Sequence, residues 1–241
     1  VTIVMVNIGQ SFFLANDIDL YDSESDTPCK VNNSNLLQEF GTVTNIFSDK
    51  TGTLTANEMR LVNFYSNQHV FTSIAFSSNP DLEREKATND PIVCSFFLSL
   101  ALCHTMNRDS LGTLQAESPD ELALLEGIEA FGYKLLRRST TNITISIQES
   151  EISYQILGVN AFNSDRKRMS LILKNANTNE YFLVCKGADS IMLDLCDINQ
   201  TDRFNTTKEI DAFARKGLRT LCVTRKSLTE GQVNEWLIYS N

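Results

Sequence analysis

The residues that could do chemistry gather in one short string, Asp49-Lys50-Thr51-Gly52-Thr53-Leu54-Thr55. An aspartate carboxylate can attack the γ-phosphate of a nucleotide and form an acyl phosphate. Lys50, the hydroxyls of Thr51 and Thr53, and backbone N–H groups near Gly52 can hold phosphate oxygens, while a magnesium ion neutralises their charge. The alternative is a polar turn that follows a strand. Taken whole, the seven residues favour phosphoryl acceptance by Asp49.

No other nucleotide-binding motif accompanies this string. The sequence lacks G-x-x-x-x-G-K-[ST] and G-x-G-x-x-G, and glycine makes up only 10 of its 241 residues. A P-loop or a dinucleotide-binding fold is therefore not supported. The two histidines, His69 and His104, are isolated, and we expect structural roles for both.

Two features predict how the chain positions these groups. Residues 43–47 form an apolar, β-prone run just before Asp49, which predicts a strand with a carboxylate at its C-terminal end, as in parallel α/β sheets. The string Ser118-Pro119-Asp120-Glu121 predicts a helix start, with an N-cap serine, a proline at the first helical position and a glutamate that completes a capping box. This helix is expected to end near Gly132.

The rest of the chain predicts an α+β fold, an antiparallel sheet flanked by helices, preceded by a partial α/β segment. Spacing and composition predict strands at 61–66, 142–147, 153–161, 168–174, 180–185 and 218–224, helices at 91–106, 188–196 and 203–216, and a polar loop at 77–90.

Composition narrows the classes of ligand. The formal net charge is −9, with 42% hydrophobic and 21% charged residues, which is ordinary for a globular protein and argues against a nucleic-acid-binding surface. Residues 1–150 carry nine basic and 19 acidic side chains, whereas residues 151–241 carry 12 and 11. An anionic ligand is therefore expected at the C-terminal part.

The first fifteen residues carry no charge and are too short to span a membrane as a helix, which needs about 20 residues. Two readings remain open, a buried helix of a soluble protein or the end of a transmembrane helix. Residues 17–26, with five acids, predict a solvated linker.

The string DKTGTLT resembles the phosphorylation motif of P-type ATPases. Four further segments, SPDELAL, FNSDRKRMS, CKGAD and GLRTL, are similar to the type IV subfamily, the phospholipid flippases. Upstream, VNIGQSFFLANDIDLYD resembles the exit from the fourth transmembrane helix of that family. The resemblance covers essentially the whole chain.

The departures from the family pattern are informative as well. The T-G-E-S, T-G-D and G-D-G-x-N-D segments of the family do not occur. The resemblance therefore implies a fragment: residues 1–16 as the end of a transmembrane helix, 17–62 as linker and the first, haloacid-dehalogenase-like part of a phosphorylation domain, and 63–241 as a nucleotide-binding domain. Haloacid-dehalogenase phosphatases usually carry a second aspartate two positions after the nucleophile. Thr51 stands there instead, which disfavours a phosphatase.

The resemblance also implies residue roles around the base. Phe162 corresponds to the ring that stacks on adenine, whereas a lone phenylalanine otherwise belongs to a core. Glu121 corresponds to a residue near the adenine amino group, although the capping box is a competing explanation for it. Ser164 and Lys167 lie in the same segment as nucleotide contacts.

Further implied roles concern the phosphates and the metal. Lys186 corresponds to a lysine that lines the nucleotide pocket. Arg219, with Thr220 beside it, corresponds to the arginine that reaches the phosphates, and bidentate geometry suits arginine to this role. ATP and Mg²⁺ are the implied cofactors, with Asp49 and Thr51 as the metal-binding residues.

The resemblance implies ATP-driven phospholipid translocation through a phospho-Asp49 intermediate, in an integral membrane protein whose present portion faces the cytosol. This chain alone is expected to bind ATP without turning it over. The partners implied are ATP, a phospholipid and an accessory membrane subunit, with no nucleic acid. The alternatives are a cation-transporting P-type ATPase and an isolated ATP-binding module.

Overall fold

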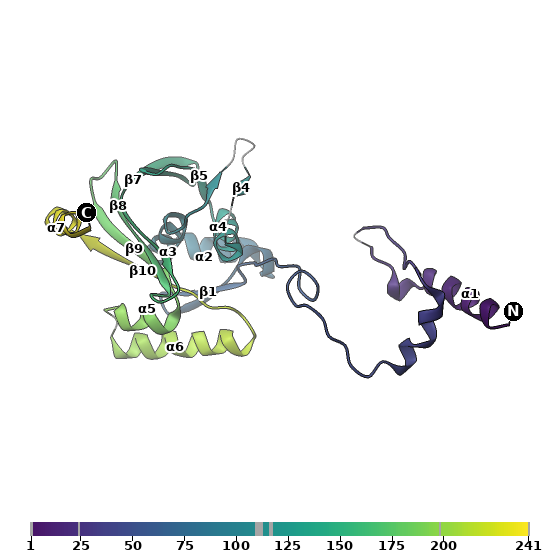
Figure 1. Ribbon diagram of the computed structural model, residues 1–241. Helices are drawn as coiled ribbons and strands as arrows, with labels where there is room; N and C mark the ends of the chain where they lie inside the picture. The colour runs from purple at the N-terminus through teal and green to yellow at the C-terminus, as the bar shows by residue number, and fades with distance from the viewer. Residues whose placement is uncertain (1, 24, 109–112, 116–117, 198, 241) are drawn as a thin grey trace. The chain divides into compact units, whose positions relative to one another are not determined.

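A computed structural model describes residues 2–23, 25–108, 113–115, 118–197 and 199–240. The chain divides into two compact units, Val1–Ala56 and Asn57–Asn241. Both are seen in Figure 1.

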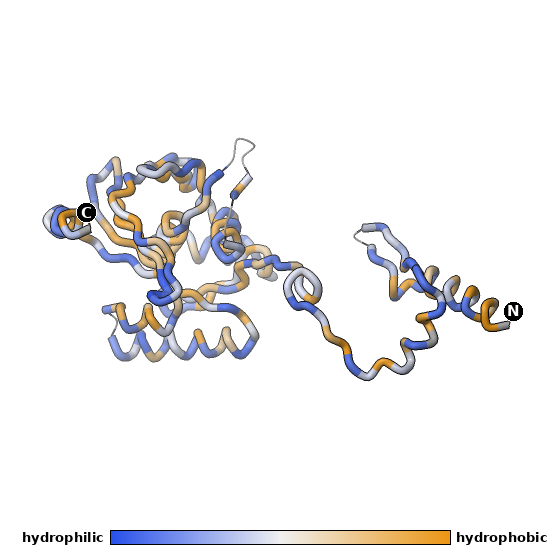
Figure 2. The backbone as a smooth tube through the Cα atoms, in the orientation of Figure 1, coloured by the Kyte–Doolittle hydropathy of each residue, from blue (hydrophilic) through white to orange (hydrophobic). Residues whose placement is uncertain are grey.

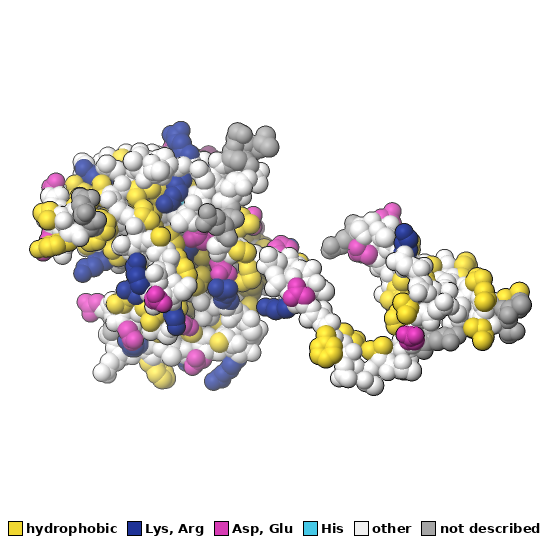
Figure 3. Space-filling model, viewed as in Figure 1, with side chains coloured by type: hydrophobic (Ala, Val, Ile, Leu, Met, Phe, Trp, Pro, Cys, Tyr) yellow, Lys and Arg dark blue, Asp and Glu magenta, His cyan; other side chains and the backbone are white. Residues whose placement is uncertain are grey.

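The first unit contains the helix α1 (Thr2–Ala15) and three short 3-10 helices, η1 (Ile18–Leu20), η2 (Ser34–Gln38) and η3 (Phe40–Thr42). Most of the apolar side chains of α1 are exposed. The backbone of this helix carries hydrophobic colouring in Figure 2, and apolar side chains lie at its surface in Figure 3. None of the helices in the described ranges is long and apolar enough to cross a membrane.

The strand predicted at residues 43–47 is absent from the structure. The described residues of the first unit contain only two isolated bridges, Asp22 with Thr27 and Thr51 with Thr55. Ile46 and Phe47 are exposed. A β-prone run becomes a strand only when a neighbouring strand satisfies its N–H and C=O groups, and no described residue of this unit supplies one.

The second unit is built on a six-stranded antiparallel sheet in the order β10-β9-β8-β7-β6-β5. The predicted α+β class is therefore confirmed. The sheet strands are β5 (Tyr133–Arg138), β6 (Asn142–Ile147), β7 (Ser150–Asn163), β8 (Arg168–Asn175), β9 (Tyr181–Gly187) and β10 (Cys222–Leu228). Two hairpins accompany it, β1 (Asn63–Ser66) with β2 (His69–Thr72), and β3 (Asn107–Arg108) with β4 (Leu114–Gln115).

The helices of this unit are α2 (Pro80–Thr88), α3 (Pro91–Leu102), α4 (Pro119–Glu129), α5 (Asp189–Leu195), α6 (Gln200–Arg215) and α7 (Glu230–Ser240), with the 3-10 helix η4 (Ile74–Phe76). The apolar helix α3 contacts β5 and β10, the two edge strands. The sheet is therefore curved around α3, as Figure 1 shows.

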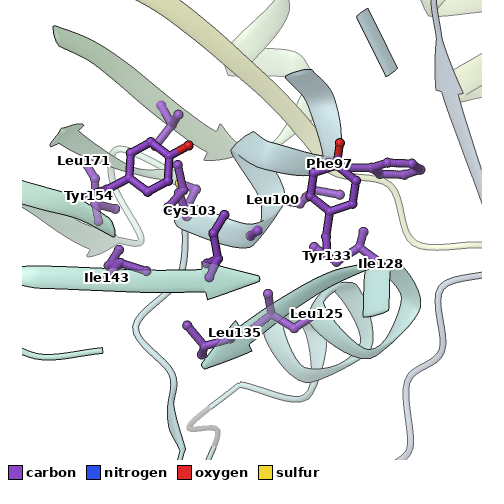
Figure 4. Packing of buried hydrophobic residues seen from close by; sticks show 14 of the residues in the cluster. Phe97, Leu100, Cys103, Leu125, Ile128, Tyr133, Leu135, Ile143, Tyr154 and Leu171 are labelled. Atoms are coloured by element: carbon purple, nitrogen blue, oxygen red, sulfur yellow. The ribbon is translucent and has the colours of Figure 1, made fainter. Parts of the chain in front are cut away.

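The core fills the space between α3, α4 and the sheet. Asp90 caps α3 by accepting from the N–H of Ile92 at 2.8 Å, and Pro91 begins the helix. Figure 4 shows Phe97 and Leu100 of α3 facing core residues of α4 and of strands β5 to β8. This packing of an apolar helix into a curved sheet fixes the strand ends that carry the predicted site residues.

The prediction of a polar loop at residues 77–90 is wrong for most of that range, because the helix α2 occupies Pro80–Thr88. Its start follows ordinary helix signals: Pro80 lies in the first turn and Asn79 accepts from the N–H of Leu82 at 3.3 Å. The last strand begins at Cys222 rather than at residue 218, so that Arg219 and Thr220 precede β10.

A glycine on β7 allows α7 to pack on the sheet. A Cβ atom added to Gly158 would lie 2.3 Å from the Trp236 ring of α7. We therefore expect Gly158→Ala to displace the ring and destabilise the unit by roughly 1–3 kcal/mol. Urea unfolding followed by Trp236 fluorescence measures this loss. Gly231→Ala is the control, since its Cβ would come no closer than 4.0 Å to another atom; equal stability of the two variants would contradict the expectation.

Candidate nucleotide-binding site

The strand register brings the predicted residues of the second unit to one end of the sheet. Lys186 pairs with Met169, and Gly187 pairs with both Arg168 of β8 and Cys222 of β10. The turn that contains Ser164 joins β7 to β8 at this same end. The end of β9, the β7–β8 turn and the entry to β10 are therefore neighbours.

Gly187 is required for this close approach. A Cβ atom at Gly187 would lie 2.6 Å from the carbonyl oxygen of Lys167 and 2.6 Å from the Cβ of Arg168. The same carbonyl oxygen accepts from the N–H of Ala188 at 3.0 Å. The glycine after Lys186 thus fixes the β7–β8 turn against the end of β9.

Glu121 and Lys186 form a buried ion pair at this end. Lys186 Nζ lies 3.0 Å from Glu121 Oε1, and each residue is only 7% exposed. The backbone N–H and the hydroxyl of Thr105 both donate to Glu121 Oε2, each at 3.0 Å. Burial by itself raises the pKa of Glu121, but the Lys186 ammonium and the Thr105 hydrogen bonds outweigh it and hold the pKa below its ordinary value. The carboxylate is therefore a charged acceptor at neutral pH.

The predicted capping box does not form, although the helix begins where expected. Ser118 is the N-cap of α4, but its side chain makes no capping hydrogen bond. The carboxylate of Glu121 instead bonds with Thr105 and Lys186. A buried cation and two donors stabilise a carboxylate more than one N–H at an exposed helix end does. The competition over Glu121 is decided in favour of the buried network.

Arg219 and Thr220 are tied to the first turns of two helices. Arg219 Nη2 lies 3.0 Å from Asp120 Oδ2 of α4, and the Thr220 hydroxyl donates to Asp189 Oδ2 of α5 at 3.1 Å. The Arg219 side chain is mostly exposed. The guanidinium therefore stays open to an incoming anion beside the Glu121–Lys186 pair.

Phe162 lies near the end of β7 with 63% of its surface exposed. The ring is therefore not part of the core, which was the alternative to a stacking role. Ser164 and Lys167 are exposed in the β7–β8 turn, where Lys167 has a left-handed φ of 51°. The face of the second unit seen in Figure 3 carries basic and acidic side chains intermixed.

Asp49, Lys50 and Thr51 belong to the first unit and form a compact turn there. The carbonyl oxygen of Lys50 accepts from the N–H groups of Thr53, Leu54 and Thr55 at 3.4, 3.0 and 3.0 Å. Asp49 Oδ1 accepts from the Lys50 N–H at 2.8 Å, and the Asp49 side chain is exposed. Gly52, with a φ of 80°, supplies the left-handed residue of the turn.

The candidate residues fit ATP more completely than they fit Mg²⁺. An exposed aromatic ring, a charged acceptor and two cations fit the base and phosphates of ATP. No group of three or more His, Cys, Asp or Glu residues able to hold a metal is found in the described ranges. Mg²⁺ commonly takes only one or two protein carboxylates and completes its shell with phosphates and water. Asp49 and the oxygens of Thr51 fit that limited share of a magnesium site.

Sequence reasoning missed three residues that hold the site. Thr105 has no motif around it that points to Glu121, and the two are 16 positions apart. Asp120 and Asp189 were visible as acidic residues in first helical turns, where the helix dipole favours them. No motif in the sequence indicated that Asp120 would pair with Arg219, or Asp189 with Thr220.

The fold and the charged end of β9 agree with a comparison of the sequence with known protein families. Residues 94–237, more than half of the chain, match the family described as P-type ATPase, cytoplasmic domain N. The chain therefore belongs to this family, and the resemblance to P-type ATPases is confirmed.

Within the family, the chain is similar to phospholipid-transporting ATPases. It is 36% identical to phospholipid-transporting ATPase IC of Xenopus tropicalis over 98% of this chain and 21% of that protein. It is 34% identical to phospholipid-transporting ATPase IC of Homo sapiens, with the same coverage, and 34% identical to phospholipid-transporting ATPase DRS2 of Saccharomyces cerevisiae, over 98% of this chain and 19% of that protein. The chain spans about a fifth of the length of these curated relatives.

Proposed function

We propose that this chain supplies the ATP-binding domain and the phosphate acceptor of a phospholipid-translocating, membrane-embedded P-type ATPase. The observation that carries the proposal is the buried Glu121–Lys186 pair at the sheet end where Phe162 is exposed. A fixed charged acceptor and an exposed ring at the same end of the sheet suit a base with an amino group. The names of the similar proteins favour a phospholipid over a cation as the transported substrate.

In this proposal the second unit binds the nucleotide. The ring of Phe162 stacks on adenine, and the Glu121 carboxylate accepts from the adenine amino group. Lys186 keeps that carboxylate charged and lines the pocket, while Arg219 exchanges Asp120 for a phosphate oxygen. Thr220, Ser164 and Lys167 are additional contacts at the pocket entrance.

The chemical step is assigned to Asp49. A carboxylate oxygen of Asp49 attacks the γ-phosphorus, the bond from that phosphorus to the β,γ-bridging oxygen breaks, and ADP leaves with the electron pair. Lys50 and the Thr51 hydroxyl orient the phosphoryl oxygens. Bound Mg²⁺, held by Asp49 and Thr51, would supply charge neutralisation at the phosphates.

The remaining assignments follow from the same proposal. Residues 1–16 are the end of a transmembrane helix, 17–62 begin the phosphorylation domain, and 63–241 form the nucleotide-binding domain on the cytosolic face. A phospholipid and an accessory membrane subunit interact with segments of the ATPase outside these residues. An isolated ATP-binding module is the alternative, and detection of the same reading frame continuing into further membrane segments separates the two.

Replacement of Phe162 tests the nucleotide pocket. In the 241-residue chain, Phe162→Ala should weaken ATP binding by roughly 1–3 kcal/mol, or about five- to 150-fold, because base–aromatic stacking is lost. Calorimetric titration measures the affinity. Since the ring is exposed, the melting temperature should hardly change.

Phe204→Ala is the matched control, because Phe204 is a phenylalanine of similar exposure on α6. It should leave ATP affinity unchanged. Equal affinities of the Phe162→Ala variant and the unmodified chain would contradict the stacking role.

A further inference from the structure

The Glu121 carboxylate is held in place from outside its own helix. Glu121 occupies the third position of α4, from which its side chain could reach back to the N–H of Ser118. Instead, Thr105 gives its Oε2 two hydrogen bonds, and Lys186 gives its Oε1 one. Thr105 lies between α3 and β3.

The backbone around Thr105 is anchored on both sides. His104 is 1% exposed, and its Nε2 lies 3.0 Å from the carbonyl oxygen of Ala101. The carbonyl oxygen of His104 accepts from the guanidinium of Arg138 on β5. On the other side, Met106 is 1% exposed in the core. The two donors of Thr105 are therefore fixed relative to the sheet.

This arrangement uses most of the acceptor capacity of the carboxylate. A carboxylate has about four lone-pair sites, two on each oxygen. Among the hydrogen bonds of the described residues, Thr105 takes both sites on Oε2 and Lys186 takes one on Oε1. Among these bonds, the second site on Oε1, the oxygen that Lys186 contacts, takes no donor. An N–H donor would be accepted there, whereas a carbonyl oxygen would meet a negative charge.

We propose that Thr105 is a positioning residue for base selection: by fixing Oε2 of Glu121, it presents Oε1 to purine bases with a 6-amino group and disfavours those with a 6-carbonyl group. This inference rests on the proposed nucleotide-binding function. Without the Thr105 hydroxyl, the carboxylate can turn toward Ser118, and the distinction between amino and carbonyl bases weakens.

Thr105→Val removes the hydroxyl, keeps the shape and leaves the backbone N–H in place. In the 241-residue chain, this variant should bind ATP about three- to tenfold more weakly, the effect of one hydrogen bond. Binding of inosine triphosphate, which carries a carbonyl in place of the amino group, should hardly change. Calorimetric titration of both nucleotides gives the selectivity, and Thr105→Ser should restore it.

A second readout needs no nucleotide. Charged or titratable groups near Glu121 are Lys186 on β9, Arg138 on β5, and Cys103 and His104 after α3. Carbon-13 NMR of the Glu121 carboxyl should show its titration midpoint moving to higher pH in Thr105→Val, because a hydrogen bond to the charged form is lost. Thr141→Val, at an exposed threonine outside this network, should leave the midpoint unchanged.

The outcomes separate the two levels of the proposal. A fall in the ATP-to-inosine-triphosphate ratio together with the shifted midpoint supports the positioning role. An unshifted midpoint, equal weakening of both nucleotides, or failure of Thr105→Ser to rescue selectivity overturns it. Failure of the unmodified chain to bind ATP, or to prefer it over inosine triphosphate, overturns the proposed base contact of Glu121 and base selection by Thr105 with it.

Discussion

In the full-length ATPase that we propose, Asp49→Asn is expected to abolish the acid-stable phosphoenzyme while ATP binding survives. An amide is not a nucleophile toward phosphorus, so the acyl phosphate cannot form. The local fold should persist, because the amide oxygen of asparagine can still accept from the Lys50 N–H, as Asp49 Oδ1 does at 2.8 Å. The turn is also held by the Lys50 carbonyl oxygen, which the substitution leaves intact.

The measurement is acid quenching after incubation with ATP labelled at the γ-phosphate. The unmodified protein should retain label on the polypeptide, and the Asp49→Asn variant should retain none. Asp19→Asn, at another exposed aspartate of the same unit, is the control and should retain label like the unmodified protein. Label still trapped on the Asp49→Asn protein would remove Asp49 from the acceptor role.

The second large effect is on stability. Lys186→Met should destabilise the second unit by roughly 3–5 kcal/mol, because it leaves the carboxylate of Glu121 buried without its cation. Urea unfolding followed by the fluorescence of Trp236, the only tryptophan in the sequence, reports this loss. Lys226→Met, at an exposed lysine of β10, should change stability little.

The double variant Glu121→Gln with Lys186→Met distinguishes a lost ion pair from lost packing. Because it removes the buried charge as well, it should be more stable than Lys186→Met alone. A double variant no more stable than Lys186→Met would show that the loss does not come from a buried charge left without its cation.

The pH dependence should reverse sign between the two proteins. In the unmodified protein the pKa of Glu121 is lowered, so its contribution is fully present above the ordinary value of 4.5 and is lost as pH falls through the lower folded-state pKa. In Lys186→Met, burial dominates and raises the pKa of Glu121. The folded state then binds more protons than the unfolded state, and stability should fall as pH rises above 4.5. Urea midpoints measured from pH 3, below the ordinary pKa of Glu121, up to pH 8 test this reversal.

Local patterns in the sequence predicted most of the second unit. Alternating strands and a proline-initiated apolar helix are set by neighbours within one turn or one strand, so β6 and α3 were found with correct starts. The motif strings likewise led to the P-type ATPase family, because each string is read residue by residue. The apolar run at residues 43–47 was misjudged, since a strand depends on a partner that local sequence does not supply.

The amino-acid sequence thus determined five of the six sheet strands, the family and the set of candidate residues, whereas β5 was not predicted. Only the tertiary structure decided which of those residues contact one another. In the sequence, a capping box and a binding role were both possible for Glu121. The structure excludes the capping box, because the carboxylate bonds to Thr105 and Lys186, which lie 16 and 65 positions away. The stabilisation comes from burying a charge together with its cation and donors, and only the packing of α3 and α4 against the curved sheet brings those groups together.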